Sequence, residues 1–425
     1  MSWVEVLYDN NAGGKVRRQL RDDLRERGDA ARRGGDRDDV KRRVGVTHVV
    51  THLQLSSCSR FGVGHQIRAE VVGSLLRPDY LVAARKQLEG GEIDPPSFKK
   101  LEDRAVDEAV AAQVAAGIDV ITDGEQRRYA FFGHLVDAMA GFDKLGGWAI
   151  PFRDEKGEQL VFQRPVVVEK LRPLRSMAAE DFTYLRAKTD TPVKVMMISA
   201  QQAAAYYDPD KSKGAYPTRD AYLADIVDLS RREVDELVRL GCTYIQIDAP
   251  QYAALLDPEL REGYRKRGSD PEKLIDTCID MDNAIISDHP GVTFAMHICR
   301  GNNQSKFYAA GDYEPIARIF ERTRFNRFLL EYDDERSGGF GPLKHVPEDR
   351  VVVLGLVTSK KPALESEDEL KRRIEEASRY IPLERLALSP QCGFASTMEG
   401  NRLTQLDQQK KLQLVGSVAR TVWGS

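Results

Sequence analysis

The feature that most constrains the fold is a regular alternation of short apolar runs with longer amphipathic segments, which continues from residue 69 almost to the C-terminus. The runs have the length of buried strands, and the segments between them have helical periodicity. Alternation over this length, without a GxGxxG or P-loop motif, favours a (β/α)8 barrel over a doubly wound sheet within the α/β class. The nine apolar runs are residues 69–74, 118–122, 160–170, 193–198, 243–248, 292–296, 327–331, 351–357 and 386–389.

One of the nine runs must lie outside an eight-stranded barrel, and the segment 148–170 is the best candidate. Pro151-Phe152 and Leu160-Val161-Phe162 flank the turn-prone Asp154-Glu155-Lys156-Gly157, which predicts an extra β-hairpin. Helices are expected in most of the remaining segments, and glycines at positions 117 and 241 end two of them. The expected helices cover residues 81–90, 97–116, 218–240, 270–287, 315–323, 367–380 and 403–423.

Residues 1–66 differ in composition from the rest of the chain. Between Lys15 and Arg43 the segment is rich in arginine, aspartate and glycine and has few large apolar side chains. Such a segment cannot bury enough apolar surface to fold alone. We therefore expect residues 1–66 to be a disordered tail or a spurious N-terminal extension, followed by one barrel domain over residues 67–425.

Composition excludes several classes of partner. The 63 basic and 66 acidic residues give a formal charge of −3, which argues against a nucleic-acid-binding surface. No apolar run approaches the roughly 18 residues that a membrane span requires. The five cysteines are few, odd in number and widely spaced, which is typical of a reducing compartment and predicts a cytoplasmic location.

The main functional signal is the segment Met296-His297-Ile298-Cys299, which ends an apolar run. Side chains alternate along a strand, so His297 and Cys299 are expected to point to the same side. An imidazole and a thiol at a strand end supply half of a tetrahedral zinc site. The pair alone is a weak signal, because buried thiols often pack as small apolar side chains.

Glu331 and Cys392 are candidates for the other half, since each follows or ends a separate apolar run. The intervals Cys299–Glu331 and Glu331–Cys392 are 32 and 61 residues, which is too long for a zinc finger and suits ligands from separate strands of one barrel. Zinc held by two thiolates, an imidazole and a carboxylate has a total charge of about −1, so it is a poor Lewis acid but lowers the pKa of an incoming thiol. The predicted chemistry is therefore S-alkylation by a zinc-bound thiolate, whose sulfur displaces the harder ligand Glu331.

Other polar residues at strand ends suit a small zwitterion. Glu125 and Asp248 are expected to hold an ammonium group through charge-assisted hydrogen bonds, and Ser74 after Gly73 is expected to bind a carboxylate. Each has an ordinary structural alternative: an ion pair with a neighbouring arginine for Glu125, a turn cap for Asp248 and a helix cap for Ser74.

Taken in order, these motifs resemble the catalytic C-terminal half of cobalamin-independent methionine synthase over about residues 68–424. The resemblance implies a TIM barrel of the UROD/methionine-synthase-like type that uses zinc and methylates homocysteine. The motifs are Val72-Gly73-Ser74, Asp123-Gly124-Glu125, Ile245-Gln246-Ile247-Asp248-Ala249-Pro250, His297-x-Cys299, Glu331 and Pro390-Gln391-Cys392-Gly393. The implied roles are metal ligands at His297, Cys299, Glu331 and Cys392, homocysteine contacts at Gly73, Ser74, Glu125 and Asp248, and catalytic functions for Glu331 and Asp248.

Two departures from the family pattern bear on the methyl donor. Full-length members carry an additional N-terminal barrel that helps to bind polyglutamyl folate, and here only residues 1–66 precede the barrel. The family also has a catalytic histidine in a segment that corresponds to residues 354–360, where this sequence has none. The chain is more similar to the short single-barrel relatives, so we expect a corrinoid, a corrinoid protein or a simple methyl donor to convert homocysteine to methionine.

Two other functions stay open from the sequence. Epoxyalkane:coenzyme M transferase is a similar branch that opens an epoxide with a zinc thiolate, and cations such as Arg300, Lys306 and Lys360 suit the sulfonate of coenzyme M. Coenzyme M has no ammonium group, so homocysteine explains Glu125 and Asp248 better. The remaining alternative is a non-catalytic barrel that is stabilised by zinc or that chaperones a corrinoid.

Overall fold

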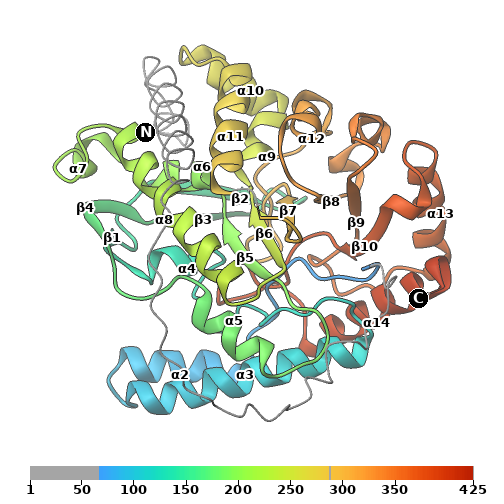
Figure 1. Ribbon diagram of the computed structural model, residues 1–425, viewed down its shortest axis with the longest axis horizontal. Coiled ribbons are helices and arrows are strands. Elements are labelled where there is room, and N and C mark those ends of the chain that lie inside the picture. The colour runs from blue at the N-terminus through green and yellow to red at the C-terminus, as the bar shows by residue number, and fades with distance from the viewer. Residues whose placement is uncertain (1–66, 287–288, 425) are drawn as a thin grey trace, which may run out of the picture. The chain divides into compact units, whose positions relative to one another are not determined.

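The computed structural model describes residues 67–286 and 289–424, and the extension expected at residues 1–66 lies outside the described residues. Six parallel strands form the central sheet in the order β10-β9-β8-β7-β6-β5 (Figure 1). Their bounds are β5 Val195–Ile198, β6 Tyr244–Asp248, β7 Thr293–Ile298, β8 Arg327–Glu331, β9 Val351–Val357 and β10 Leu386–Pro390.

Three isolated parallel bridges continue the sheet from β5 round to β10. They pair Ile121 with Val193, Glu70 with Val120, and Ala69 with Leu388. The runs predicted at 69–74 and 118–122 therefore supply two further short strands, and the eight strands close on themselves. The predicted (β/α)8 TIM barrel is confirmed.

The interior of the barrel contains an apolar layer next to a buried charged group. Seven side chains from seven strands pack together: Val72, Val120, Tyr244, Ala295, Leu329, Val353 and Ala387. Glu70 accepts hydrogen bonds from Lys194 Nζ at 2.8 Å, Tyr244 Oη at 2.8 Å and Arg327 Nη2 at 2.7 Å. Burial opposes ionisation of Glu70, yet the two cations lower its pKa to about 2. The carboxylate thus links three strands across the barrel.

Helices cover the outside of the barrel, and their ends follow local signals in the sequence (Figure 1). The long helix α3 begins after Asp94, whose side chain accepts a hydrogen bond from Ser97 N, and ends at Gly117 with φ 73°. The α-helices are α2 Asp79–Glu89, α3 Pro95–Ala116, α4 Gly133–Val136, α5 Ala179–Arg186, α6 Ala200–Ala203, α7 Pro209–Ser212, α8 Arg219–Arg239, α9 Gln251–Leu256, α10 Pro258–Lys266, α11 Pro271–Ile285, α12 Arg318–Arg322, α13 Glu367–Ser378 and α14 Gln405–Trp423. Short 3-10 helices are η2 Ala204–Tyr206, η3 Glu314–Ile316, η4 Glu335–Ser337, η5 Gly341–His345 and η6 Leu383–Arg385. No helix in residues 67–286 or 289–424 is long and apolar enough to cross a membrane.

The predicted hairpin outside the barrel is confirmed. Strands β2 (Ala149–Arg153) and β3 (Gln159–Gln163) pair antiparallel, and a second antiparallel pair, β1 (Met139–Asp143) with β4 (Val166–Pro173), precedes and follows them. Arg153 exchanges backbone hydrogen bonds with Phe307 at 2.8 and 2.9 Å. The hairpin is therefore attached to the loop that follows β7.

Candidate functional site

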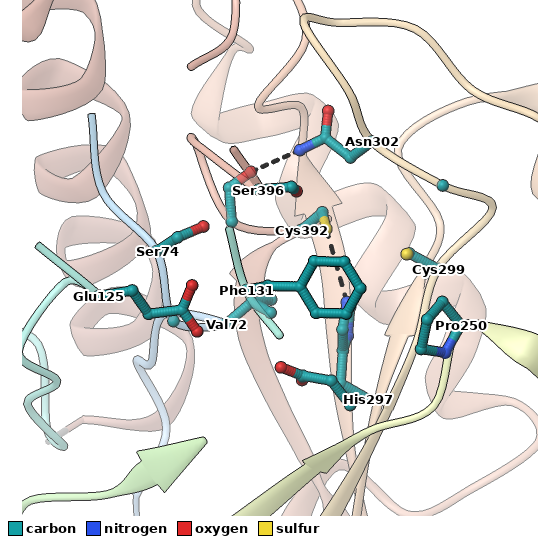
Figure 2. A pocket seen from close by; sticks show the side chains of 14 residues that line it. Val72, Ser74, Glu125, Phe131, Pro250, His297, Cys299, Asn302, Cys392 and Ser396 are labelled. Atoms are coloured by element: carbon teal, nitrogen blue, oxygen red, sulfur yellow. Dashed lines mark hydrogen bonds between the residues drawn. The ribbon is translucent and has the colours of Figure 1, made fainter. Parts of the chain in front are cut away.

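A pocket lies at the C-terminal ends of the barrel strands, where the loops of this fold build functional sites (Figure 2). It brings together seven of the eight residues predicted for the site, and Glu331 is the exception. In Figure 2, Ser74 and Glu125 lie on one side, and His297, Cys299 and Cys392 lie on the other. The lining residues are Val72, Gly73, Ser74, Glu125, Phe131, Asp248, Pro250, His297, Cys299, Gly301, Asn302, Cys392, Gly393 and Ser396.

His297, Cys299 and Cys392 form a compact group of metal-ligand atoms. One ligand atom from each lies within 4.8 Å of the others, all three residues are buried, and Cys392 Sγ is 3.6 Å from His297 Nε2. His297 Nδ1 lies 3.2 Å from the Leu329 carbonyl, so we assign its proton to that hydrogen bond. This tautomer leaves the Nε2 lone pair facing the thiols, as in many metal-binding histidines.

The two thiols are electrostatically unequal. The hydrogen bond from Cys392 lowers the pKa of Cys299 well below its usual range, and His297 adds to the effect. The same hydrogen bond, together with burial, raises the pKa of Cys392. One thiolate is thus favoured before any metal binds, and two sulfurs with one imidazole nitrogen are a donor set that fits zinc.

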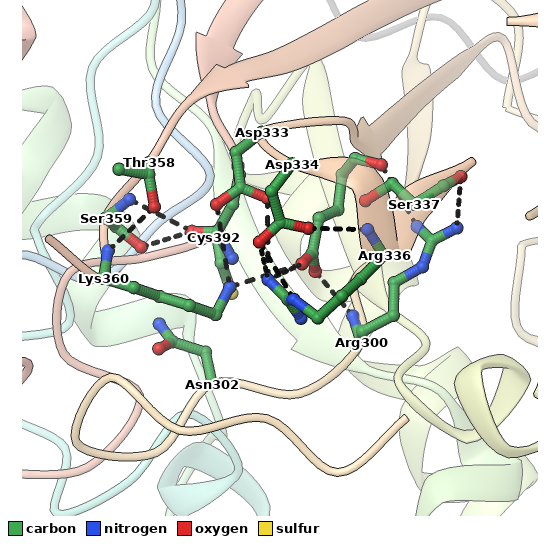
Figure 3. Close-up of polar contacts among 12 residues, drawn as sticks. Arg300, Asn302, Asp333, Asp334, Arg336, Ser337, Thr358, Ser359, Lys360 and Cys392 are labelled. Carbon is green, nitrogen blue, oxygen red and sulfur yellow. Dashed lines mark hydrogen bonds and ion pairs between the residues drawn. The ribbon is translucent and has the colours of Figure 1, made fainter. Parts of the chain in front are cut away.

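Glu331 lies outside this group of three. Its Oε2 accepts a hydrogen bond from Arg300 N at 2.6 Å, and its Oε1 lies 3.3 Å from Lys360 Nζ and 3.4 Å from Arg336 Nη2 (Figure 3). Burial alone would raise the pKa of Glu331, but the cations Lys360, Arg336 and Arg300 lower it to about 2. The carboxylate is therefore ionised and paired with cations.

Glu125 and Asp248 are the two carboxylate residues that line the pocket, and Asp248 of β6 pairs in register with His297 of β7. Burial and the charge of Asp248 raise the pKa of Glu125 to about 7, although Arg128 Nη1 lies 3.2 Å from its Oε1. Glu125 Oε2 has no hydrogen-bond partner among the described residues, and the residue has φ 53°, which is uncommon for a side-chain-bearing residue. Burial also raises the pKa of Asp248, whose Oδ1 accepts from Gln246 Nε2 at 2.8 Å. A bound ammonium would favour the ionised form of both.

Gly73 and Ser74 lie at the end of the first barrel strand, residues 69–74, where Met196 and the segment after β10 pack closely against them. A Cβ on Gly73 would lie 3.1 Å from Met196 Cγ, and a Cβ on Gly393 would overlap Ser74 Oγ. Phe394 N donates to the Ser74 carbonyl at 2.8 Å, so the segment after β10 packs against this strand. Ser74 does not cap the following helix, because the N-cap of α2 is Pro78.

The other seven lining residues were not predicted as site residues, and they include Phe131, Asn302 and Ser396. Asn302 Nδ2 donates to the Gly393 carbonyl at 2.7 Å, while its Oδ1 has no partner in the part of the chain that the structure describes. The signal for Asn302 was its position, since it lies three residues after Cys299 in the loop that follows β7. Phe131 and Ser396 lie in loops without a comparable pattern.

The fold and the pocket together define a (β/α)8-barrel protein in which a buried thiol–imidazole group and two carboxylates line one pocket. Comparison with known proteins gives the family. The model of the cobalamin-independent synthase catalytic domain matches residues 69–412, and the chain belongs to this family.

The matches to individual relatives cover most of this chain and most of each relative. The Bacillus subtilis protein YxjH is 34% identical over 360 residues, which cover 84% of this chain and 94% of YxjH. The methionine synthase of Pyrococcus abyssi is 24% identical over 324 residues, which cover 76% of this chain and 85% of that protein. The structure of a B12-independent methionine synthase from Shewanella sp. W3-18-1 shares the fold, with a TM-score of 0.66 and 19% identity over 84% of this chain and 97% of that chain.

Proposed function

We propose that the protein is a zinc-dependent S-methyltransferase that converts homocysteine to methionine. The observation that carries the proposal is the single pocket that His297, Cys299 and Cys392 share with the carboxylates of Glu125 and Asp248. Within this pocket the three metal-ligand residues suit the thiol of homocysteine, and the two carboxylates suit its ammonium group. The family and the name of the Pyrococcus abyssi relative support the same reaction.

The residues of the chain have separate tasks in this reaction. His297, Cys299 and Cys392 would hold zinc, with Glu331 as the fourth, exchangeable ligand. Bound zinc supplies a site for the substrate sulfur and lowers the pKa of its thiol.

The other contacts orient the substrate. Asp248 and Glu125 bind the ammonium of homocysteine, and Ser74 with Gly73 binds its carboxylate. The hydrogen bond from His297 Nδ1 to Leu329 O fixes the imidazole so that its Nε2 faces the sulfur atoms. Burial of the group excludes water, which keeps the thiolate a strong nucleophile toward the methyl carbon.

The methyl donor is proposed to differ from polyglutamyl folate. Residues 354–360 contain no histidine, and the segment ends in Lys360, whose buried ammonium is paired with Glu331. When a corrinoid, a corrinoid protein or a simple methyl donor gives up its methyl group, the leaving group does not need the protonation that a folate nitrogen requires. Such a donor is therefore compatible with a segment that has no histidine.

The test is a thiol titration of the zinc-loaded protein, in which proton release reports deprotonation of the bound thiol. Homocysteine is expected to give saturable release. 4-Mercaptobutyrate, which keeps the thiol and carboxylate but has no ammonium, is expected to bind more weakly.

Coenzyme M is the discriminating third thiol. It has a sulfonate and no ammonium, so Glu125 and Asp248 would repel it. Release with coenzyme M and none with homocysteine would replace the proposal by the epoxide-opening reaction. Release with neither thiol would favour the non-catalytic barrel.

A further inference from the structure

The cations around Glu331 form a defined cluster beside the pocket (Figure 3). Lys360 follows β9, and its side chain is only 5% exposed, with Nζ 3.3 Å from Glu331 Oε1 and 4.0 Å from Asp333 Oδ2. A buried ammonium is stable only beside a carboxylate or comparable acceptor. Two carboxylates are thus within reach of one buried cation.

Asp333 has an acceptor that the observed arrangement leaves unused. Its side chain is 1% exposed, yet Oδ1 has no hydrogen-bond partner among the described residues and lies 3.9 Å from Arg336 Nη2. Arg336 instead donates to Asp334 from Nε at 2.9 Å. A buried carboxylate oxygen without a hydrogen bond is destabilising, which favours a second arrangement in which this oxygen accepts one.

We propose that Lys360 is a positioning residue that exchanges partners between Glu331 and Asp333, and that this exchange sets how readily Glu331 leaves the metal. In one arrangement Glu331 is turned toward the thiol–imidazole group and Lys360 pairs with Asp333. In the other, which the structure shows, Glu331 pairs with Lys360 and Arg336.

The physical reason is the cost of a displaced carboxylate. When a substrate sulfur takes the place of Glu331, the carboxylate stays buried at the end of β8, and without a cation it would be an uncompensated buried charge. Lys360 lowers the free energy of this displaced state. Lys360 therefore increases the affinity for the thiol, and it decreases by the same factor the affinity for the metal that Glu331 provides. This inference rests on the proposed function and deepens it.

The experiment compares Lys360→Met with Lys361→Met. Lys361 is the matched control, because it is the adjacent lysine but is exposed and pairs with Glu155 at 2.7 Å on the hairpin. Zinc affinity is measured by chelator competition without thiol, and homocysteine affinity by the proton-release titration.

Lys360→Met is expected to bind homocysteine about 10- to 100-fold more weakly, because one charge-assisted hydrogen bond to the displaced carboxylate is lost. The same variant is expected to bind zinc more tightly by a comparable factor, about 10- to 100-fold. Lys360→Arg should restore both affinities to near the wild-type values, and Lys361→Met should change neither.

A general loosening of the site would weaken zinc and homocysteine binding together, and that result would overturn the proposal, as would an unchanged homocysteine affinity. Asp333→Asn provides a second measurement if Lys360→Met does not fold. Among the residues that the structure describes, it leaves Glu331 as the one carboxylate within 4.0 Å of Lys360 Nζ, so zinc affinity should fall while homocysteine affinity does not. Any other pattern counts against the exchange.

Failure of the proposed function is recognised separately. If the wild-type protein binds zinc but no homocysteine, the methyltransferase proposal fails. The zinc measurements on Lys360→Met and Asp333→Asn still decide the partner exchange by their opposite signs.

Discussion

Replacing Asp248 with asparagine is expected to weaken homocysteine binding through the loss of one charge. Asp248 is buried at the end of β6, and its Oδ1 accepts a hydrogen bond from Gln246 Nε2 at 2.8 Å, which the asparagine oxygen can keep. The substitution therefore removes the charge with almost no change in volume. A hydrogen bond between a buried carboxylate and an ammonium contributes about 1.5–3 kcal/mol, which corresponds to about a 10- to 150-fold increase in the dissociation constant.

The assay is the proton-release titration with two thiols. The Asp248→Asn variant should bind 4-mercaptobutyrate as well as the wild type does, because that thiol has no ammonium for Asp248 to bind. Burial raises the pKa of Asp248, so removing its charge should not lower the midpoint of thermal unfolding. Equal loss of affinity for both thiols would refute the assigned role, since it would indicate a distorted pocket.

Three further predictions concern the pH dependence of homocysteine binding, the affinity for zinc and the pH dependence of stability. Burial and Asp248 raise the pKa of Glu125 to about 7, so homocysteine affinity should fall from about pH 8 to about pH 6 as Glu125 is protonated. Calorimetric titrations of Glu125→Gln should give weaker binding at the higher pH and a flatter profile, and an unchanged slope would contradict this. Cys392→Ser should lose zinc affinity on the order of 100-fold in a chelator competition, while Cys242→Ser, a buried thiol outside the group of three, should not. Burial raises the pKa of Asp282 to about 7, so the folded state binds its proton more tightly than the unfolded state, and this contribution to stability is lost as pH rises from about 4 through 7. Denaturant unfolding of Asp282→Asn should therefore show a smaller decrease in stability between about pH 5 and about pH 8 than the wild type, and an identical decrease would rule out Asp282 as its source.

The barrel strands were predictable because parallel strands buried on both faces read as continuous apolar runs. Strands β8 and β9 fall on the predicted residues 327–331 and 351–357. The predicted run 160–170 is divided between β3 and the first part of β4, and β1 was not predicted. A shift in register lies between Ala140 and Phe142, where Gly141 has φ 109°, and it interrupts the alternation that marks a strand. The predicted helix at 315–323 is divided into η3 and α12.

The thiol–imidazole group was predictable for a different reason. His297 and Cys299 are two residues apart on one strand, so alternation alone places them on the same side, and Cys392 follows the strand that closes the barrel. The surroundings of Glu331 were not predictable. They depend on Lys360 and on an arginine that reaches back from the loop after β8, and no sequence pattern specifies such side-chain contacts.

The charged group inside the barrel has a consequence for how the protein can change. Lys194 Nζ donates both to Glu70 and to Gln246 Oε1, and Gln246 in turn donates to Asp248, so an unbroken line of hydrogen bonds runs from the barrel interior to a carboxylate that lines the pocket. Loss of one charged partner leaves the others buried and uncompensated, at a cost of about 3–5 kcal/mol. A single substitution at one of these charged positions is therefore costly, and the hydrogen bonds through Gln246 connect its effect to the Asp248 carboxylate in the pocket.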